Sequence, residues 1–338
     1  MRLYRLGKLG SLDALQLKSA ESPVAGAGQV VVRMRACSLN HRDLTILSGK
    51  YSSVAIMPGA IPVSDGAGEV LAVGPGVAQW KVGDRVAPIF MQRWLGGELR
   101  PDYKTSALGG PSDGVLAEEI VVSEEGLVRI PPHLTFEQAA TLPCAAVTAW
   151  NAALVRGRLQ PGQTLVTLGT GGVSLFAAQL ALVMGAKVIA TTGSDAKVER
   201  LRQLGVDEVI NYRTTPDWDA RVRELTGGLG ADLVIEVGGP GSLAKSIAAI
   251  RYCGHVSAVG NLAGNAMIDP GTLFAKRASM CGIQVGSRDM FEAMNRAIEA
   301  AALEPLVDRV FDFTEARAAY EYLASGRQFG KVVIRVSA

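Results

Sequence analysis

One glycine-rich segment has the residue types and spacing that most directly imply chemistry. It reads Gly169-Thr170-Gly171-Gly172-Val173-Ser174 and lies between two apolar runs, residues 165–168 and 175–184. In a strand–turn–helix context, the first glycine permits a tight turn and Gly171 lets the backbone approach a pyrophosphate. The N-terminus of the following helix adds N–H donors and a partial positive charge. The segment predicts a dinucleotide site, with Ser174 as the small third residue of the motif.

The end of the next apolar run indicates which dinucleotide binds. An acidic residue at this place would hold the ribose 2′-OH of NAD, but the sequence there is Thr191-Thr192-Gly193-Ser194. The hydroxyls of Thr192 and Ser194, together with Lys197, could bind a 2′-phosphate that a carboxylate would repel. Lys197 could equally be a solvated helix residue, and Asp195 suits a helix N-cap. We therefore expect NADP(H) rather than NAD(H).

The elements that position this turn follow a repeating order. From about residue 144, apolar strands, glycine turns and helix-like runs alternate, with candidate strands at residues 165–168, 188–191, 208–210, 233–236 and 255–259. This order is typical of a parallel sheet with crossover helices, which is an α/β, doubly wound fold. A last apolar strand at residues 278–285 would lie at the edge of the sheet. Because exposed edges are usually covered by pairing, we expect a homodimer.

The N-terminal part of the chain has a different pattern. Up to about residue 122, short β-branched runs are broken by Gly and Pro turns, which predicts an irregular barrel. Residues 91–114 are rich in Gly and polar residues and predict a long surface loop. A helix at 289–302 and a strand at 329–334 would return the chain to this part. We expect one domain of residues 1–143 with 288–338, and a second of residues 144–287.

Size, charge and cysteine usage limit the possible functions. The chain has 338 residues and a formal net charge of +2 without a Lys/Arg cluster, so nucleic acid is a poor candidate partner. Its four cysteines form neither a Cys-x-x-Cys pair nor a disulfide framework, which favours the cytoplasm. The N-terminus lacks the apolar stretch of a signal peptide. The uncharged run at 159–186 contains five glycines and Pro161, so we expect a buried strand, turn and helix rather than a membrane span.

Several segments together resemble the medium-chain dehydrogenase/reductase superfamily, and within it the zinc-free quinone oxidoreductase-like branch. They are Asn40-His41-Arg42-Asp43, Ser64-Asp65-Gly66-Ala67-Gly68-Glu69-Val70, Val82-Gly83-Asp84-Arg85-Val86, Gly171-Gly172 with Gln179, and Gly330-Lys331-Val332-Val333. The resemblance spans essentially the whole chain. It implies a Rossmann domain with a β-rich, GroES-like catalytic domain, and it also implies a homodimer.

The resemblance allows a test for zinc. Zinc alcohol dehydrogenases place a cysteine, a His-Glu pair and a second cysteine around a catalytic metal, and those positions hold Asn40, Ser64 and Cys144 here. One thiol with an amide and a hydroxyl is a poor ligand set for Zn²⁺. The family's four-cysteine structural loop has no counterpart either. Cys37 and His41 are better explained as a strand-end thiol and a phosphate-facing imidazole. We expect no metal.

Further cofactor contacts carry over from the resemblance. His41 and Thr148 would contact the pyrophosphate and the nicotinamide side, and Tyr212 would pack near the adenosine 2′-phosphate. The remaining expected contacts lie at strand ends and in the terminal motif: Gly238, Val259, Gly260, Val285, Ser287 and Lys331. Ordinary turn chemistry could explain the glycines equally well.

Without a metal, reduction of a simple carbonyl loses its Lewis acid. Quinones and α,β-unsaturated carbonyls need less help, because positioning and one or two hydrogen bonds to the oxygen that gains charge can suffice. Asn40 is the candidate donor to that oxygen, and the proton would come from Tyr51, Thr45 or water, with Tyr51 preferred. The expected activity is zinc-independent, NADPH-dependent hydride transfer to a quinone or enone. The alternatives are a zinc-free alcohol or aldehyde dehydrogenase/reductase and a non-catalytic NADPH-binding protein.

Overall fold

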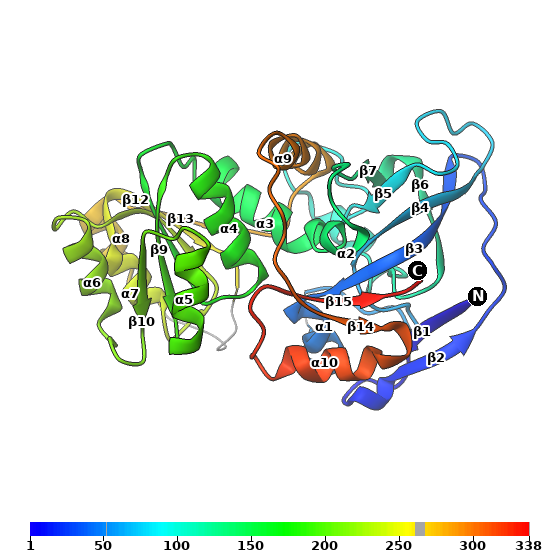
Figure 1. Ribbon diagram of the computed structural model, residues 1–338, viewed down its shortest axis with the longest axis horizontal. Helices are drawn as coiled ribbons and strands as arrows, with labels where there is room; N and C mark the ends of the chain where they lie inside the picture. Colours follow the sequence, from blue (N-terminus) through cyan, green and yellow to red (C-terminus); the bar gives the residue numbers. More distant parts are fainter. Residues whose placement is uncertain (52, 261–267, 338) are drawn as a thin grey trace. The chain divides into compact units, whose positions relative to one another are not determined.

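The computed structural model describes residues 1–51, 53–260 and 268–337, and the chain forms two compact units (Figure 1). Unit 1 comprises Met1–Val147 and Gly286–Ala338, and unit 2 comprises Thr148–Val285. The polypeptide therefore leaves unit 1 once and returns to it once. The sequence-based domain limits at residues 143 and 288 remain a prediction.

Unit 2 contains a six-stranded sheet in which every neighbouring pair is parallel. The strand order is β10-β9-β8-β11-β12-β13. The bounds are β8 Thr164–Leu168, β9 Lys187–Thr192, β10 Glu208–Asn211, β11 Ala231–Glu236, β12 Ile250–Ala258 and β13 Ser279–Gly282. The chain starts in the middle at β8, proceeds outward through β9 and β10, and then crosses to β11. Ligands of such folds bind where the strand order reverses, at the carboxyl ends of β8 and β11.

Helices connect these parallel strands. They are α4 Gly172–Val183, α5 Asp195–Gln203, α6 Trp218–Leu225, α7 Leu243–Ala249 and α8 Pro270–Lys276. Trp218 and Val222 of α6 and Ile247 of α7 pack in one apolar cluster with Val166 and Val234 of the sheet. A parallel sheet covered by helices buries its strands on both faces, and β8 and β11 are buried at all but one position each. The α/β doubly wound prediction is confirmed.

Two short π-helical segments, Leu142–Ala146 and Asn151–Arg156, flank the single turn α3 (Val147–Trp150). Segments of this kind are rare and are often found at functional sites. The sequence contains no signal for them, because a π turn differs from an α turn by only one inserted residue. They bring Asn151 into the interior of unit 2, where its side chain is 4% exposed.

Unit 1 is β-rich, as predicted. Its main sheet runs β14-β15-β3-β4-β5-β7, with β6 also paired to β3, and β1 and β2 form a separate ribbon. The strands are β1 Arg2–Leu6, β2 Leu15–Ser19, β3 Gln29–Leu39, β4 Asp65–Val73, β5 Arg85–Pro88, β6 Glu119–Ser123, β7 Leu127–Arg129, β14 Val307–Asp312 and β15 Lys331–Arg335. Among these strands of the described residues, β14–β15 is the parallel pair and the other pairs are antiparallel.

Four helices accompany these strands: α1 His41–Leu47, α2 Phe136–Ala139, α9 Arg288–Ala300 and α10 Ala316–Ala324. Short 3₁₀ turns cover Leu12–Ala14, Pro101–Ser106, Glu124–Gly126 and Phe313–Glu315. The returning segment contributes β15, which pairs antiparallel with β3 so that Val332 lies opposite Leu39. This pairing brings the last residues of the chain beside the start of α1.

None of the helices in the described part of the chain is long and apolar enough to cross a membrane. The uncharged run at 159–186 contains β8 and α4, which are separated by the turn at Gly169. Gly169 adopts a φ of 72°, a left-handed conformation that suits glycine and interrupts any continuous helix. The run is divided into a strand, a turn and a helix, as the glycines predict.

Candidate functional site

The glycine-rich turn in unit 2 has the form that a dinucleotide requires. A Cβ built on Gly169 or Gly171 would meet no atom within 4 Å, so the space beside the turn is open. Gly171 is the N-cap of α4 and offers no side chain to occupy that space. Ser174 Oγ donates to Leu168 O at 2.6 Å and ties the first turn of the helix to the end of β8. The residues fit a pyrophosphate at the helix N-terminus.

The end of β9 lies beside Tyr212. Tyr212 N donates to Thr192 O at 3.0 Å, and a Cβ on Gly193 would lie 2.4 Å from Tyr212 OH. A side chain at position 193 would displace the Tyr212 ring, which lies against Gly193. Ser194 N donates to Thr192 Oγ1 at 3.3 Å, and Lys197 is half-buried in the first turn of α5. The structure thus groups Thr192, Ser194 and Tyr212.

Asp195 differs from the expectation that it caps a helix. The N-cap of α5 is Ser194, without a side-chain cap, and Asp195 is the first helical residue. Its Oδ1 atom accepts a hydrogen bond from Asn211 Nδ2 at 2.6 Å. The N-cap prediction is wrong because β10 supplies an amide partner that draws this carboxylate toward Asn211.

A buried carboxylate holds the loop after β11. Glu236 is 1% exposed, and its Oε1 atom accepts hydrogen bonds from Gly238 N at 2.7 Å, Gly239 N at 2.9 Å and Ser242 Oγ at 2.7 Å. Ser246 Oγ donates to Oε2. Sequence reasoning selected Gly238 but missed Glu236. The available signal was an acidic residue at the end of an otherwise apolar strand.

The predicted contacts at the ends of β12 and β13 occupy tight backbone positions. A Cβ on Gly260 would lie 2.6 Å from Val237 O, so the chain passes close to the β11 loop there. Val285 has a φ of 46°, which is an uncommon and strained conformation for a β-branched residue. Asn151 Nδ2 donates to Val285 O at 2.7 Å and stabilises this turn. Sequence reasoning selected Val285 but not Asn151.

The other predicted cofactor residues have varied surroundings. Thr148 is buried in α3 and His41 is exposed at the start of α1. Ser287 is the N-cap of α9, with Met290 N donating to its Oγ at 3.3 Å. Contacts of these three residues with a cofactor remain predictions.

A cluster of buried polar side chains surrounds Asn40 in unit 1. Asn40 is the N-cap of α1, and its backbone N–H donates to Asp43 Oδ2 at 2.7 Å. Lys331 is 4% exposed, and its Nζ donates to Asn40 Oδ1 and to Leu39 O, both at 2.6 Å. Within the described residues, the buried Asn40 Nδ2 atom has no hydrogen-bond partner. The Asn40 side chain also lies close enough to Asp65 to lower the pKa of that carboxyl, and the role of Nδ2 as a donor to substrate stays a prediction.

The other two positions that match zinc ligands in the family are engaged elsewhere. Ser64 Oγ donates to Asp65 Oδ1 at 2.6 Å, and Cys144 N donates to Asp65 Oδ2 at 2.9 Å. Burial, together with the charge of Asp65, raises the pKa of the Cys144 thiol to about 12, so the thiol is protonated in the metal-free protein. The Lys331 ammonium already lies against the Asn40 oxygen. These residues do not fit a catalytic zinc ion.

Clusters of metal-ligating side chains bear on the same question, and the expected absence of zinc stays a prediction. Across residues 1–51, 53–260 and 268–337, no group of three or more His, Cys, Asp or Glu side chains could hold a metal ion. Burial also raises the pKa of the Asp65 carboxyl, and the nearby Lys331 ammonium opposes that shift. An additional cation beside Lys331 would be repelled.

The candidate proton donors lie near the Arg42 side chain. Its guanidinium is 5.3 Å from the Tyr51 ring centroid and 4.6 Å from that of Phe90, and Nη1 donates to Leu108 O at 2.8 Å. The Tyr51 ring is thus held by a cation–π contact. Thr45 Oγ1 donates its proton to Arg42 O at 2.8 Å within α1. This geometry favours Tyr51 over Thr45 as the proton donor.

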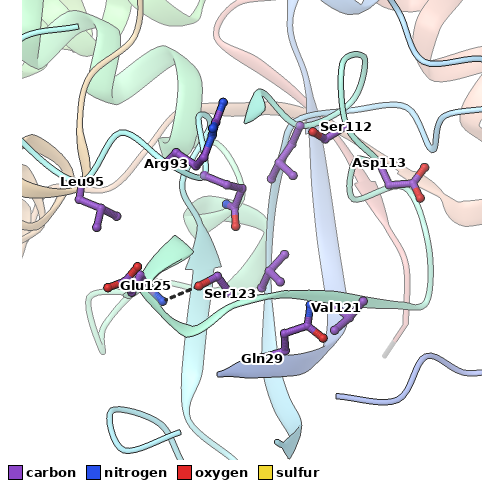
Figure 2. A pocket seen from close by; sticks show the side chains of 11 residues that line it. Gln29, Arg93, Leu95, Ser112, Asp113, Val121, Ser123 and Glu125 are labelled. Atoms are coloured by element: carbon purple, nitrogen blue, oxygen red, sulfur yellow. Dashed lines mark hydrogen bonds between the residues drawn. The ribbon is translucent and has the colours of Figure 1, made fainter. Parts of the chain in front are cut away.

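A hollow of about 390 Å³ lies elsewhere in unit 1 (Figure 2). The 91–114 segment contributes Arg93, Leu95, Ser112 and Asp113 to its lining, and strand β6 contributes Val121. Neither Asn40 nor Tyr51 lines it. The 91–114 segment therefore forms part of a cavity, but this cavity does not contain the candidate catalytic side chains.

Comparison with known proteins assigns the family. Residues 26–132 match the model of an alcohol dehydrogenase GroES-like domain, and residues 172–300 match the model of a zinc-binding dehydrogenase. A zinc-type alcohol dehydrogenase-like protein of Schizosaccharomyces pombe is 40% identical, and the match covers 97% of each chain. The chain belongs to the medium-chain dehydrogenase/reductase superfamily. It is accordingly an oxidoreductase with a GroES-like and a Rossmann domain.

Other members of this superfamily differ in their named activities. The human quinone oxidoreductase is 27% identical, with 99% of this chain and 97% of the relative covered. A solved structure of an NAD-dependent alcohol dehydrogenase is 32% identical, has a TM-score of 0.89 and matches over 100% of both chains. These relatives agree on the fold and on oxidoreduction, and they differ in the substrate that their names specify.

Proposed function

We propose that this protein is a zinc-independent, NADPH-dependent reductase of quinones or α,β-unsaturated carbonyl compounds. The Asn40 side chain carries this proposal. Its Oδ1 atom accepts a hydrogen bond from the buried Lys331 ammonium, so the unpartnered Nδ2 is left as a donor at a position where zinc relatives have a metal ligand. A neutral donor of this type suits an acceptor that spreads its negative charge onto oxygen.

The residues of unit 1 would perform two tasks in the reaction, and the cofactor a third. A bound nicotinamide supplies the hydride. Asn40 Nδ2 would donate a hydrogen bond to the substrate oxygen that gains negative charge. Tyr51 OH or a water molecule would deliver the proton that completes the reduction, because the Thr45 hydroxyl is engaged by Arg42 O. The reduced product thus receives one hydride and one proton.

The preference for NADPH is inferred from the end of β9. Thr192, Ser194, Lys197 and Tyr212 supply hydroxyls and a cation, and Oδ1 of the neighbouring Asp195 accepts a hydrogen bond from Asn211 Nδ2. A mycobacterial protein complexed with NADPH is 25% identical and has a TM-score of 0.84. The NAD-dependent relative shows that the superfamily also uses the other nucleotide. The residues of this chain favour the phosphorylated one.

A second candidate is a zinc-free alcohol or aldehyde dehydrogenase/reductase. The Schizosaccharomyces pombe relative, named zinc-type alcohol dehydrogenase-like, favours it. Against it stands the missing Lewis acid, which is worth several kcal/mol for a simple carbonyl. A non-catalytic NADPH-binding protein is the third possibility, since a dinucleotide site establishes binding but not turnover.

One assay separates these functions. Purified protein, whose zinc content is measured by elemental analysis, is given NADPH or NADH with panels of quinones, enones, aldehydes and alcohols. We expect NADPH oxidation with quinones or enones, no loss of activity with EDTA, and less than stoichiometric zinc. Asn40→Ala should lower kcat by about 10²-fold, as for the loss of an oxyanion donor, with NADPH affinity retained. One zinc per chain required for activity, or turnover of aldehydes alone, would refute the proposal.

A further inference from the structure

We propose that Lys331 is a positioning residue whose buried ammonium fixes the Asn40 amide so that Nδ2 is presented as the hydrogen-bond donor of the catalytic site. The catalytic role of Asn40 in this inference rests on the proposed function. The contact between Lys331 and Asn40 rests on the geometry of unit 1. It assigns Lys331 to Asn40, whereas the sequence pattern suggested a cofactor contact.

The contacts of Lys331 allow only one orientation of the amide. An ammonium group has three donors and no acceptor, so only Oδ1 of an asparagine can face it. Lys331 Nζ lies 2.6 Å from Asn40 Oδ1 and 2.6 Å from Leu39 O. If the amide were flipped, the Asn40 Nδ2 donor would face the Lys331 Nζ donor, and no hydrogen bond could form between them. The lysine therefore determines that Nδ2 is the end of the Asn40 amide that faces away from Nζ.

The backbone of Lys331 is held in place by two neighbouring segments of unit 1. The residue begins β15, and Lys331 N donates to Leu306 O at 2.9 Å, which anchors its backbone to the segment before β14. β15 then pairs with β3, the strand that ends at Leu39 just before Asn40. The sheet therefore holds the ammonium beneath the start of α1.

Burying a lysine is costly unless the charge is compensated. The described groups that interact electrostatically with the Lys331 ammonium are Asp65, Cys144 and Asp43. Asp65 is itself fixed by Ser64 Oγ and Cys144 N. An apolar residue of the same length would fill this space at lower cost. A role in orienting and polarising the Asn40 amide explains why a charged residue is used there.

The experiment compares Lys331→Met, which removes both donor and charge at similar length, with Lys331→Gln, which keeps a neutral donor. Lys276→Met is the matched control, because Lys276 Nζ also donates to two carbonyl oxygens, Ala248 O and Ile250 O, each at 2.6 Å. For each variant, kcat, the KM for NADPH and the NADPH dissociation constant are measured. The wild type, Asn40→Ala, Lys331→Met and the double variant Asn40→Ala/Lys331→Met together form a double-mutant cycle.

We expect Lys331→Met to lower kcat by about tenfold or more, with the KM and dissociation constant for NADPH changed less than about twofold, because the loss lies in transition-state stabilisation. Lys331→Gln should retain more activity than Lys331→Met, and Lys276→Met should behave like the wild type. The double variant should be no slower than Asn40→Ala, since the lysine acts through the amide. An unchanged kcat, multiplicative losses in the double variant, or weaker NADPH binding with kcat retained would overturn the inference.

A measurement that needs no substrate separates this inference from the proposed function. In protein labelled with ¹⁵N at asparagine, the Asn40 side-chain NH₂ signals are assigned by their loss in Asn40→Ala. Lys331→Met and Lys331→Gln should shift these signals, and Lys276→Met should not. Unshifted signals in folded Lys331 variants would refute the positioning role. If the wild type reduces no quinone or enone while the signals shift as expected, the proposed function fails and the positioning role stands.

Discussion

Asp43 shows how strongly burial can raise the pKa of one carboxyl group. It is almost fully buried at the start of α1, and its Oδ2 atom accepts the Asn40 backbone N–H at 2.7 Å. Burial raises the pKa of the Asp43 carboxyl to about 6, although the Arg42 guanidinium opposes the shift. The folded protein therefore keeps a proton on Asp43 at pH values where the unfolded chain has lost it.

This shift predicts a pH-dependent contribution to stability. Because the folded state binds the extra proton between about pH 4 and 6, the contribution of Asp43 to the free energy of unfolding falls as pH rises through that window. Asp43→Asn keeps an oxygen acceptor but cannot ionise. Its free energy of unfolding relative to the wild type should rise from pH 4 to pH 7 by at most about 3 kcal/mol. Urea denaturation at several pH values tests this, and parallel curves for the two proteins would contradict it.

Lys197 provides the residue-scale test of cofactor choice. If it neutralises the 2′-phosphate, Lys197→Ala should weaken NADPH binding by about tenfold, as expected for one charge-assisted hydrogen bond, and leave NADH binding unchanged. Lys187→Ala is the control, because Lys187 is exposed at the opposite end of β9. Binding is measured by the fluorescence of each nucleotide. Equal wild-type affinities for the two nucleotides, unaffected by the variant, would reject the assignment.

At the scale of elements, the loops that follow the parallel strands need side-chain hydrogen bonds in addition to the sheet. The loop from β11 to α7 depends on Glu236, which accepts hydrogen bonds from two backbone amides and two hydroxyls. A buried donor that loses its acceptor costs about 1–3 kcal/mol. The order of this loop thus rests on one carboxylate.

Glu236→Gln should lower the free energy of unfolding by about 1–3 kcal/mol and weaken NADPH binding, because it replaces one carboxylate oxygen with an amide nitrogen that cannot accept a hydrogen bond and leaves a neutral oxygen for the remaining donors. Glu224→Gln is the control, since Glu224 forms only an exposed 2.9 Å ion pair with Arg221 and should cost no more than about 1 kcal/mol. Chemical denaturation and nucleotide titration provide the two measurements. Equal stability of the two variants would show that the Glu236 cluster does not hold the loop.

At the scale of the whole molecule, the edge of the unit 2 sheet predicts assembly. β13 pairs with β12 and has no second strand partner among the described residues. Met280 on β13 is 36% exposed, and Tyr252 and Phe274 of the same unit are 68% and 86% exposed. An unpaired edge with exposed apolar side chains is usually covered, which supports the proposed homodimer.

Met280→Asp should convert this dimer to a monomer, because it would place like charges near each other if β13 meets its copy across a two-fold axis. Leu229→Asp is the control, since Leu229 is 75% exposed in a loop away from the sheet edge. Light scattering after size-exclusion chromatography reports the mass of each variant. A wild-type monomer, or a Met280→Asp dimer, would exclude assembly through this edge.

Much of the fold was predictable from local patterns. The alternation of apolar strands with helices predicts the doubly wound sheet, and Gly169 and Gly171 identify the turn that approaches a pyrophosphate. These features depend on neighbouring residues only, since strand period, turn conformation and helix start are local properties. The position of Val285 at a predicted strand end came from the same reasoning, whereas Asn40 was selected through the resemblance to zinc alcohol dehydrogenases. Sequence reasoning did not detect Glu236 and Asn151, whose partners are set by loop and π-helical geometry.

What the sequence by itself determined was the class of fold, the dinucleotide turn and the residue types at the zinc-ligand positions. Only the tertiary structure decided how those residues are used. Asn40 and Lys331 are 291 positions apart, and they meet because β15 pairs with β3. A pairing across such a separation leaves no periodic signal in the chain. For this reason the sequence identified Asn40 as a donor, and the structure showed that a buried ammonium orients it.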